Sequence, residues 1–494
     1  MIGSYLEEQA DKRAPWGILF VLMAVASLLD AIGLNRDLWF DEITLIPTVQ
    51  NPMREIITIY SGDNQHMFFL VLARISVVLF GEHPWTVRLP AVVFGVCAVP
   101  ALYFLAREVT TRREALLATI LLTVSYHLLW FSQDARGYTG MLFWTLLYTT
   151  YLLRGLRSAK WLNWLIYAVA AALGTYMYLA VVFVVLSHAA ICAWLLLFPA
   201  KSGDCRIRNW KQPAAAMTLA GLLTLLLYAP VLLQLQYNFL HHPSKMQAIS
   251  TPLWAFWETL RGLQIGFGSA AAVAVAGALF AAGLWSYWSQ SGVAAAVFVL
   301  PGVGTAAGAL AARGTMYPRF YFYLLGFVML IVVRGAMAAG AGLAGTLSHR
   351  TDKRMNGIKW GTAMVILMIV VSAISLTRNY QYPKQDFSGA KRFVETRLQA
   401  GEPVVTTGLA GYVYEQYYGL PWTQVDNVSQ LDAIRAQARR VWMIYTFPLY
   451  VERETPDLMA AIRRDCTAKQ VFPGTLGGGE VTVCILEAYS GREN

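Results

Sequence analysis

Long apolar runs recur through the first 378 residues, and they restrict the folds open to this chain. A helix needs about 20 apolar residues to cross a bilayer, and lipid admits only helices or closed barrels because it cannot hydrogen-bond an exposed backbone. Barrel strands alternate apolar and polar residues, and these runs do not. Hydrophobic residues make up 57% of the chain and charged residues 14%. We predict a polytopic α-helical membrane protein with about eleven spans, at 16–35, 87–107, 114–132, 137–153, 161–179, 181–199, 214–235, 270–288, 292–312, 320–338 and 358–377.

Basic residues gather in short segments between these runs and predict the orientation of the chain. With eleven spans, the basic segments share one side: 107–114, 154–160, 201–211 and 349–359. Basic loops stay in the cytoplasm under the positive-inside rule. The same pattern accounts for the net charge of +10 and argues against a nucleic-acid partner. The extracytoplasmic side then receives 36–86, 132–137, 236–269, 313–319 and the chain after 378.

Segment 67–81, MFFLVLARISVVLFG, is apolar but short for a span, and it carries Arg74. We predict an amphipathic helix lying at the membrane interface. If it crossed the bilayer instead, everything after it would change sides relative to the first loop.

The chain changes character after the last apolar run. Short apolar segments such as EPVVTTG and RVWMIYTFP are typical of buried strands, and FSGAKRFVETRLQ and TPDLMAAIRRD of amphipathic helices. We predict two domains: a membrane module over 1–378, with its loops and interfacial helices in 36–86, and a small extracytoplasmic α/β domain over 379–494. Cys466 and Cys484 lie in that domain, and an oxidising compartment favours a disulfide between them; two unbonded core thiols are the alternative.

Charged side chains gather in the segments expected on the outer side. Each has an ordinary structural explanation: a solvated helix face for the acids, or an aromatic belt with a snorkelling arginine for RGTMYPRFYFY. Ionisable residues at membrane depth are nevertheless costly and mostly functional. Acidic residues lie on two of these loops and basic residues on others. The basic residues could bind the phosphate of a lipid carrier while one of the acids acts as a base beside it. The candidates are Asp41, Glu42, His66, Asp134, Arg136, Tyr138, Lys245, Arg313 and Arg319.

Three motifs, in this order, resemble a known family. They are DLWFDEITL after the first span, GEHPWTVRLPAVVFGVCAVPALYFLAREV, and SQDARGYTG. Together they resemble the polyprenyl-phosphate-sugar-dependent glycosyltransferases of the C superfamily, and within it the bacterial protein-mannosyltransferase and aminoarabinose-transferase-like branch. The resemblance is close over about 36–155 and weak in the tail. The family often has His-Pro-Pro-Leu at the start of the interfacial helix, whereas this chain has Gln65-His66-Met67-Phe68, which leaves the subfamily and the acceptor open.

The resemblance implies an activity and roles for several residues. Family members pass a sugar, with inversion, from a polyprenyl-phosphate carrier to an acceptor hydroxyl on a protein, lipid or glycan. Asp41 matches the catalytic base, Glu42 its neighbour, and Asp134 the acid of the second loop. An acceptor hydroxyl needs a base within about 3 Å. Arg136, Lys245, Arg313 or Arg319 would stabilise the charge on the departing phosphate. The implied location is the bacterial cytoplasmic membrane, with the site and the C-terminal domain on its periplasmic side.

Three alternatives remain open at the level of sequence. A transporter or flippase of lipid-linked saccharides would need ionisable residues near the centres of spans, and the chain has few. A non-catalytic scaffold would only display the tail. A metal-dependent, oligosaccharide-transferring relative would bind a divalent cation through Asp41 and Asp134, with Glu42 or His66. No other cofactor is expected, because the chain has no Gly-rich phosphate loop and no Rossmann fingerprint.

Overall fold

The computed structural model describes residues 14–60, 62, 65–158, 160–198, 207, 209–241, 251–267, 269–311, 316–347 and 353–487. Contacts within it separate two compact units. The first holds the chain up to Leu34 together with Val49–Leu376, and the second holds Asn35–Thr48 together with the chain from Thr377 onward. The expected domain boundary at 378/379 stays a prediction. No feature of the sequence predicted that 35–48 groups with the tail.

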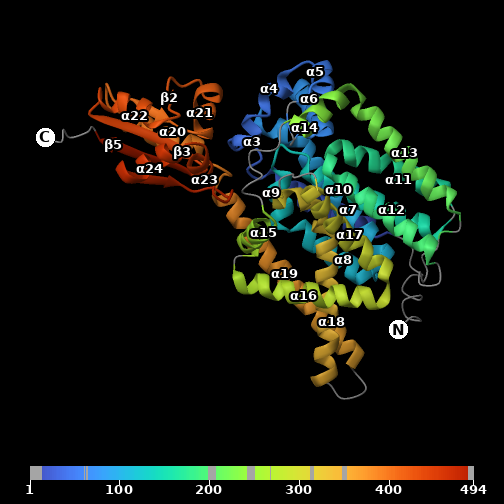
Figure 1. The fold of residues 1–494 in the computed structure, drawn as a ribbon. Coiled ribbons are helices and arrows are strands. Elements are labelled where there is room, and N and C mark those ends of the chain that lie inside the picture. The colour runs from blue at the N-terminus through green and yellow to red at the C-terminus, as the bar shows by residue number, and fades with distance from the viewer. Residues whose placement is uncertain are drawn as a thin grey trace. The chain divides into compact units, whose positions relative to one another are not determined.

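The secondary-structure elements described in the first unit are all helical (Figure 1). Short 3-10 turns at Leu179–Val181, Ala229–Val231 and Pro318–Leu324 join some of the helices. The helices are α2 (Trp16–Ala31), α4 (Ile46–Gln50), α5 (Met53–Thr58), α6 (Met67–Phe80), α7 (Pro84–Val109), α8 (Arg112–Thr123), α9 (Tyr126–Ser132), α10 (Tyr138–Arg157), α11 (Trp161–Met177), α12 (Val182–Leu197), α13 (Lys211–Tyr228), α14 (Leu232–His241), α15 (Pro252–Phe267), α16 (Ala270–Gln290), α17 (Gly292–Ala311), α18 (Leu325–Leu347) and α19 (Lys353–Gln381), of which α4 and α19 run across a unit boundary.

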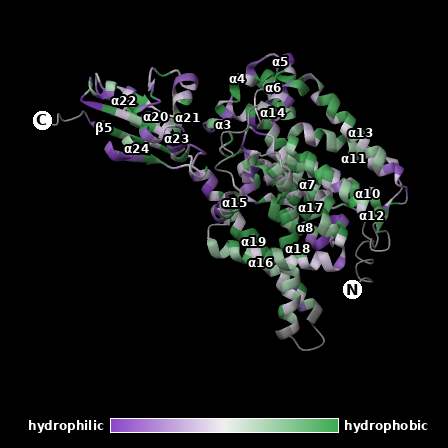
Figure 2. Ribbon diagram, in the orientation of Figure 1, coloured by the Kyte–Doolittle hydropathy of each residue, from purple (hydrophilic) through white to green (hydrophobic). Residues whose placement is uncertain are grey.

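Apolar residues cover much of these helices, as the green ribbons of Figure 2 show. Among the described residues, seven helices are long and apolar enough to cross a membrane. The bent pair α8–α9, with 53° between its halves, makes up to eight if it forms one span. The chain is therefore a multi-pass membrane protein, as predicted. Helices occupy all eleven expected positions, but the count of eleven spans stays a prediction.

Helix α6 covers the doubtful segment 67–81 and has 14 residues. At about 1.5 Å per residue it spans roughly 21 Å, which is less than the bilayer core of about 30 Å. One face is buried, including Met67 and Phe69, whereas Val78 and Leu79 are exposed. The length agrees with an interfacial helix; the exposed side chains are apolar, so the expected amphipathic character stays a prediction.

Two helices of the first unit pack backbone against backbone. A Cβ at Gly283 on α16 would overlap the carbonyl of Ile331 on α18, and a Cβ at Gly335 on α18 would overlap the carbonyl of Leu279. Small residues at such crossings let membrane helices approach closely. The pair is therefore fixed by shape as well as by apolar contact.

The second unit contains a five-stranded sheet with strand order β2-β1-β3-β5-β4. The strands are β1 (Val404–Thr406), β2 (Thr423–Gln424), β3 (Arg440–Thr446), β4 (Cys466–Phe472) and β5 (Val481–Glu487). Strand β1 is parallel to β2 and β3, and β5 is antiparallel to β3 and β4. The predicted α/β domain is confirmed. Its helical segments are α3 (Phe40–Ile43), α20 (Phe387–Glu395), α21 (Leu409–Tyr412), η6 (Val413–Tyr417), α22 (Val428–Arg435), α23 (Pro448–Glu454) and α24 (Pro456–Asp465).

The predicted disulfide joins the edge strand β4 to its neighbour β5. Cys466 and Cys484 are bonded, with their Cα atoms 5.7 Å apart. Cys484 lies in the apolar core that β3 and β5 share with α24. The alternative of two unbonded thiols is wrong, and within the described residues Cys97 and Cys192 are the free cysteines.

Candidate functional site

The acidic pair lies on α3, a single turn of helix that follows Trp39. Glu42 is fully buried, and its Oε2 accepts a hydrogen bond from the backbone N–H of Trp39 at 3.3 Å. The side chain of Glu42 thus caps the turn that carries it. Asp41 is only half-buried, and its backbone carbonyl accepts the hydroxyl of Thr44 at 3.1 Å. Of the two acids, Asp41 is the one exposed for chemistry.

The segment that carries this pair is bound to the C-terminal part of the chain. Arg36 donates to the carbonyls of Asn379, at 3.2 Å, and Tyr380. The backbone N–H of Phe40 donates to Gln385 Oε1 at 2.9 Å. Ser388 donates to the carboxylate of Asp37, and the ring of Phe40 meets Tyr412 edge-on. Residues 35–48, which form the start of the first loop, are therefore part of the second unit.

His66 is the centre of an aromatic cluster in the first unit. It immediately precedes α6 and is almost fully buried. Its ring stacks on Tyr178 with centroids 4.7 Å apart and meets Tyr138 edge-on at 5.0 Å. Tyr178 in turn contacts Phe320 at 5.5 Å. The sequence drew attention to His66 and Tyr138 but not to Tyr178, whose position between two apolar runs carries no motif.

The SQDARG loop connects α9 to α10 beside this cluster. Asp134 is fully buried, and its carbonyl accepts the backbone N–H of Arg136 at 2.6 Å. Gln133 anchors the loop by donating to the carbonyls of Asp30 and Ile32 at 2.7 and 2.8 Å, respectively. The loop is thus anchored at Gln133, and the Arg136 side chain that it carries is partly buried.

The guanidinium groups of two arginines influence the pKa of His66. Burial lowers the pKa of His66 well below its usual value, and the positive charges of Arg136 and Arg319 lower it further. Arg319 belongs to the 3-10 segment before α18 and lies over the ring of Tyr317 at 4.8 Å. His66 is therefore neutral near pH 7, and the two arginines are the charges of the cluster. We call His66, Arg136, Tyr138, Tyr178 and Arg319 the arginine–histidine cluster.

Gly137 permits this packing, and we expect Gly137→Ala to disturb it. An added Cβ would lie 2.8 Å from His66 Nδ1 and 2.7 Å from Met177 Sδ. Overpacking of this kind costs about 1–3 kcal/mol. That cost should appear as a lower thermal stability, measured by thermal unfolding of the purified protein in detergent. Gly277→Ala on α16 is the matched control, because a Cβ there meets nothing within 4 Å; equal stability of both variants would contradict the packing argument.

The structure thus brings together His66, Arg136, Tyr138 and Arg319 of the predicted residues, with Asp134 in the same loop as Arg136. Asp41 and Glu42 belong to the other unit. Lys245 and Arg313 lie outside the described residues.

A divalent cation finds little support in the arginine–histidine cluster. Two guanidinium charges that disfavour the protonation of His66 would also repel a metal ion there. In the parts of the chain that the structure covers, no three His, Cys, Asp or Glu side chains gather as metal ligands. The donor set of the cluster suits an anion.

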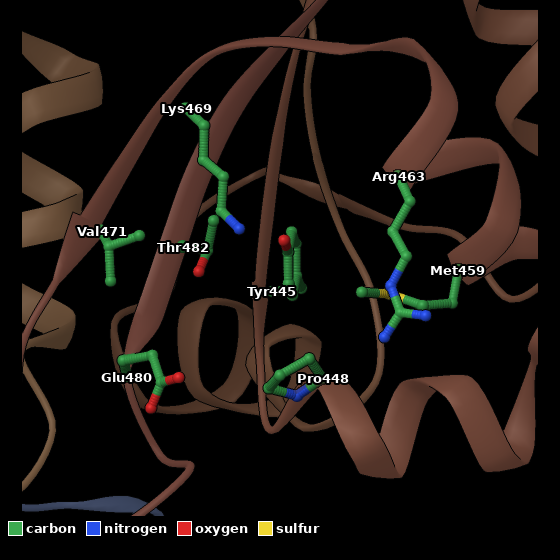
Figure 3. A pocket seen from close by; sticks show the side chains of 8 residues that line it. All are labelled: Tyr445, Pro448, Met459, Arg463, Lys469, Val471, Glu480 and Thr482. Carbon is green, nitrogen blue, oxygen red and sulfur yellow. The ribbon is translucent and has the colours of Figure 1, made fainter.

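A separate pocket of about 210 Å³ opens in the second unit, lined by both polar and apolar side chains (Figure 3). Tyr445 and Thr482, which face each other across β3 and β5, are among its lining residues. Arg463 and Lys469 also line it, but both terminal nitrogens of Arg463 are bound to Glu452 at 2.8 Å. None of the predicted site residues lines this pocket.

Comparisons with known proteins address the first unit most directly. Residues 65–234 match the family model for dolichyl-phosphate-mannose-protein mannosyltransferase. This stretch contains His66, Asp134, Arg136 and Tyr138. No curated protein sequence matches the chain.

Solved structures share the fold of nearly the whole chain. ArnT from Cupriavidus metallidurans in the apo state aligns with TM-score 0.54 and 12% identity, covering 96% of this chain and 98% of ArnT. ArnT bound to undecaprenyl phosphate gives TM-score 0.53 and 12% identity, with 95% and 98% covered. The oligosaccharyltransferase AglB from Archaeoglobus fulgidus, in complex with an inhibitory peptide and a dolichol-phosphate, gives TM-score 0.53 and 12% identity, with 94% and 74% covered.

The fold and the family-model match agree with the motifs quoted from the sequence. The chain shares the fold of ArnT and AglB, and over residues 65–234 it is similar to the dolichyl-phosphate-mannose-protein mannosyltransferase family.

Proposed function

We propose that this protein is an inverting glycosyltransferase that moves a sugar from a polyprenyl-phosphate carrier to an acceptor hydroxyl. The arginine–histidine cluster binds the carrier phosphate, and Asp41 is the general base. The reaction takes place on the outer face of a bacterial cytoplasmic membrane. Nucleotide sugars are absent there, so the donor has to arrive already activated on a lipid.

The proposed step transfers one proton and exchanges one bond. The Asp41 carboxylate takes the proton of the acceptor hydroxyl. The acceptor oxygen bonds to the anomeric carbon while the bond from that carbon to the phosphate oxygen breaks. The electron pair stays on the phosphate, which leaves with one more negative charge than it had as a diester. Arg136 and Arg319 stabilise that charge.

The observation that carries the proposal is the placement of Arg136 and Arg319 beside the buried ring of His66, whose pKa is lowered by burial and by their charges. Arginine grips phosphate with two parallel hydrogen bonds, which makes it a preferred side chain for this ligand. Phe320, which contacts Tyr178 and is only partly buried, offers an apolar surface suited to the first units of a lipid chain. Solved relatives of the same fold bind undecaprenyl phosphate and dolichol-phosphate, which supports a carrier of this class.

The activity is tested by incubating the purified protein in liposomes with polyprenyl-phosphate sugars and candidate acceptors. Transfer releases free polyprenyl phosphate, whereas a flippase would move the donor and leave the sugar attached. Mass spectrometry of envelope glycoconjugates from cells with and without the gene would identify the sugar and the acceptor. Movement of intact donor without release of polyprenyl phosphate would favour the transporter.

Arg319→Lys is expected to weaken the binding of undecaprenyl phosphate by about tenfold, which corresponds to some 1.4 kcal/mol. Lysine keeps the charge but loses the two-pronged grip and the stacking on Tyr317. Binding is measured by titration in nanodiscs. Arg261→Lys is the matched control, since Arg261 is exposed and pairs with Glu258 at 3.8 Å. Unchanged affinity in Arg319→Lys would make this residue part of an aromatic belt and not of the clamp.

Dependence on a divalent cation, through Asp41 and Asp134, is the remaining alternative mechanism. It requires that chelation with EDTA abolish transfer and that added cation restore it. Transfer that survives chelation would leave Asp41 to act as a base without a metal.

A further inference from the structure

Gln385 occupies a position between the acidic turn and the sheet of the second unit. It is fully buried, and it precedes α20 by two residues. Its Oε1 accepts the N–H of Phe40 at 2.9 Å. Its Nε2 donates to Thr446 Oγ1 at 3.0 Å and to the carbonyl of Gly479 at 2.9 Å. One side chain thus joins α3 to the ends of two strands, since Thr446 ends β3 and Gly479 comes just before β5.

The partners of this amide fix its orientation. Phe40 offers only a donor, because the group in contact is a backbone N–H. Gly479 offers only an acceptor, because the group in contact is a carbonyl. Thr446 also donates its hydroxyl to that carbonyl at 3.1 Å. Rotating the amide by half a turn would set donor against donor and acceptor against acceptor, so the network admits one arrangement.

The hydrogen bond between Gln385 and Phe40 lies at the start of the helical turn that carries Asp41. Phe40 is the first residue of α3 and Asp41 the second. The first N–H groups of a helix have no partner within the helix, and here Glu42 satisfies the N–H of Trp39 while Gln385 satisfies that of Phe40. With a helix of four residues, these two bonds set where the turn begins and hence where Asp41 points.

We infer that Gln385 is a positioning residue for Asp41. It holds the start of the acidic turn against the C-terminal sheet, and the C-terminal unit thereby serves as the scaffold of the base. The inference rests on the proposed role of Asp41. It gives the C-terminal unit a function in catalysis that requires no contact between that unit and a substrate.

The test uses Gln385→Met in the full-length protein, because Met keeps the length of the side chain and loses all three hydrogen bonds. Small misplacements of a catalytic group cost up to about 10²-fold in rate. We expect kcat to fall about 10- to 100-fold with little change in the KM for the donor. We also expect hydrogen exchange to rise in a peptide covering 38–45 while β3 and β5 stay protected. Thr446→Val removes one of the three bonds and should show a smaller change of the same kind.

Two comparisons separate positioning from a merely structural role. In an Asp41→Asn background, Gln385→Met should cause no further loss, because there is no base left to position. Arg435→Met breaks the buried ion pair with Asp465, at 2.7 Å in the same unit, and should lower thermal stability without lowering kcat.

The outcomes distinguish this inference from the proposed function. A multiplicative loss in the Asp41→Asn background, an equal loss in Arg435→Met, or unchanged exchange over 38–45 would overturn the role of Gln385. Normal turnover by Asp41→Asn alone would instead overturn the proposed base, and the exchange measurement would still report whether Gln385 holds the turn.

Discussion

Asp41→Asn is expected to slow sugar transfer by about 10²- to 10⁴-fold, the usual effect of losing a general base. Asparagine has nearly the same size but cannot take the acceptor's proton. The backbone of the turn should persist, because Thr44, Glu42 and Gln385 hold it through groups other than the Asp41 carboxylate. Binding of undecaprenyl phosphate should therefore stay unchanged. Initial rates and titrations on the same reconstituted protein measure both quantities.

Glu42→Gln is the matched control for this change. Glutamine keeps an oxygen that can accept the N–H of Trp39, so the cap on the turn survives. We expect a much smaller loss of rate than in Asp41→Asn. Normal turnover by Asp41→Asn would contradict the assignment and leave Glu42 or Asp134 as the candidate base.

Replacing both bonded cysteines with alanine is expected to lower the free energy of unfolding of the second unit by about 3 kcal/mol in the chain-entropy model of disulfides. The bridge joins residues 18 apart and ties the edge strand β4 to β5. At 1.4 kcal/mol per factor of ten, protection of the β5 amides against hydrogen exchange should fall on the order of 100-fold. Exchange of the full-length protein in detergent, followed by mass spectrometry, measures this loss for the second unit alone.

Cys97→Ala is the control for that experiment, since Cys97 is a free thiol on α7 in the first unit. It should leave protection in β4 and β5 unchanged. Recovery of unmodified, alkylatable thiols at Cys466 and Cys484 from the non-reduced protein would contradict the disulfide.

Features set by local chemistry were predictable from the sequence. Apolar runs long enough for a bilayer gave helices at every expected position, because the lipid thickness fixes the length that a span needs. The strands β1, β3 and β5 were predictable because they are apolar and buried. Strand β4 was not, because its residues between Cys466 and Phe472 are polar or exposed, as is common at the edge of a sheet.

The candidate site was predictable only in part. His66, Arg136 and Arg319 were chosen because charged groups at membrane depth are costly, and the structure brings them together. Tyr178 and Gln385 carry no local signal: one is an aromatic residue among many, and the other is a single amide in the tail. Their roles arise from contacts between distant parts of the chain, which residue spacing does not encode.

The bond between Phe40 and Gln385 has a consequence for the timing of biosynthesis. The two residues are 345 positions apart. At about 5–20 residues per second, the acidic turn would leave the ribosome roughly 20 to 70 s before its partner. During that interval the base would have no scaffold, so a nascent or prematurely terminated chain would enter the membrane without a competent base. Activity would begin only once the last strands had been made. The bond between Phe40 and Gln385 would thus make activity depend on completed synthesis of the C-terminal part of the chain.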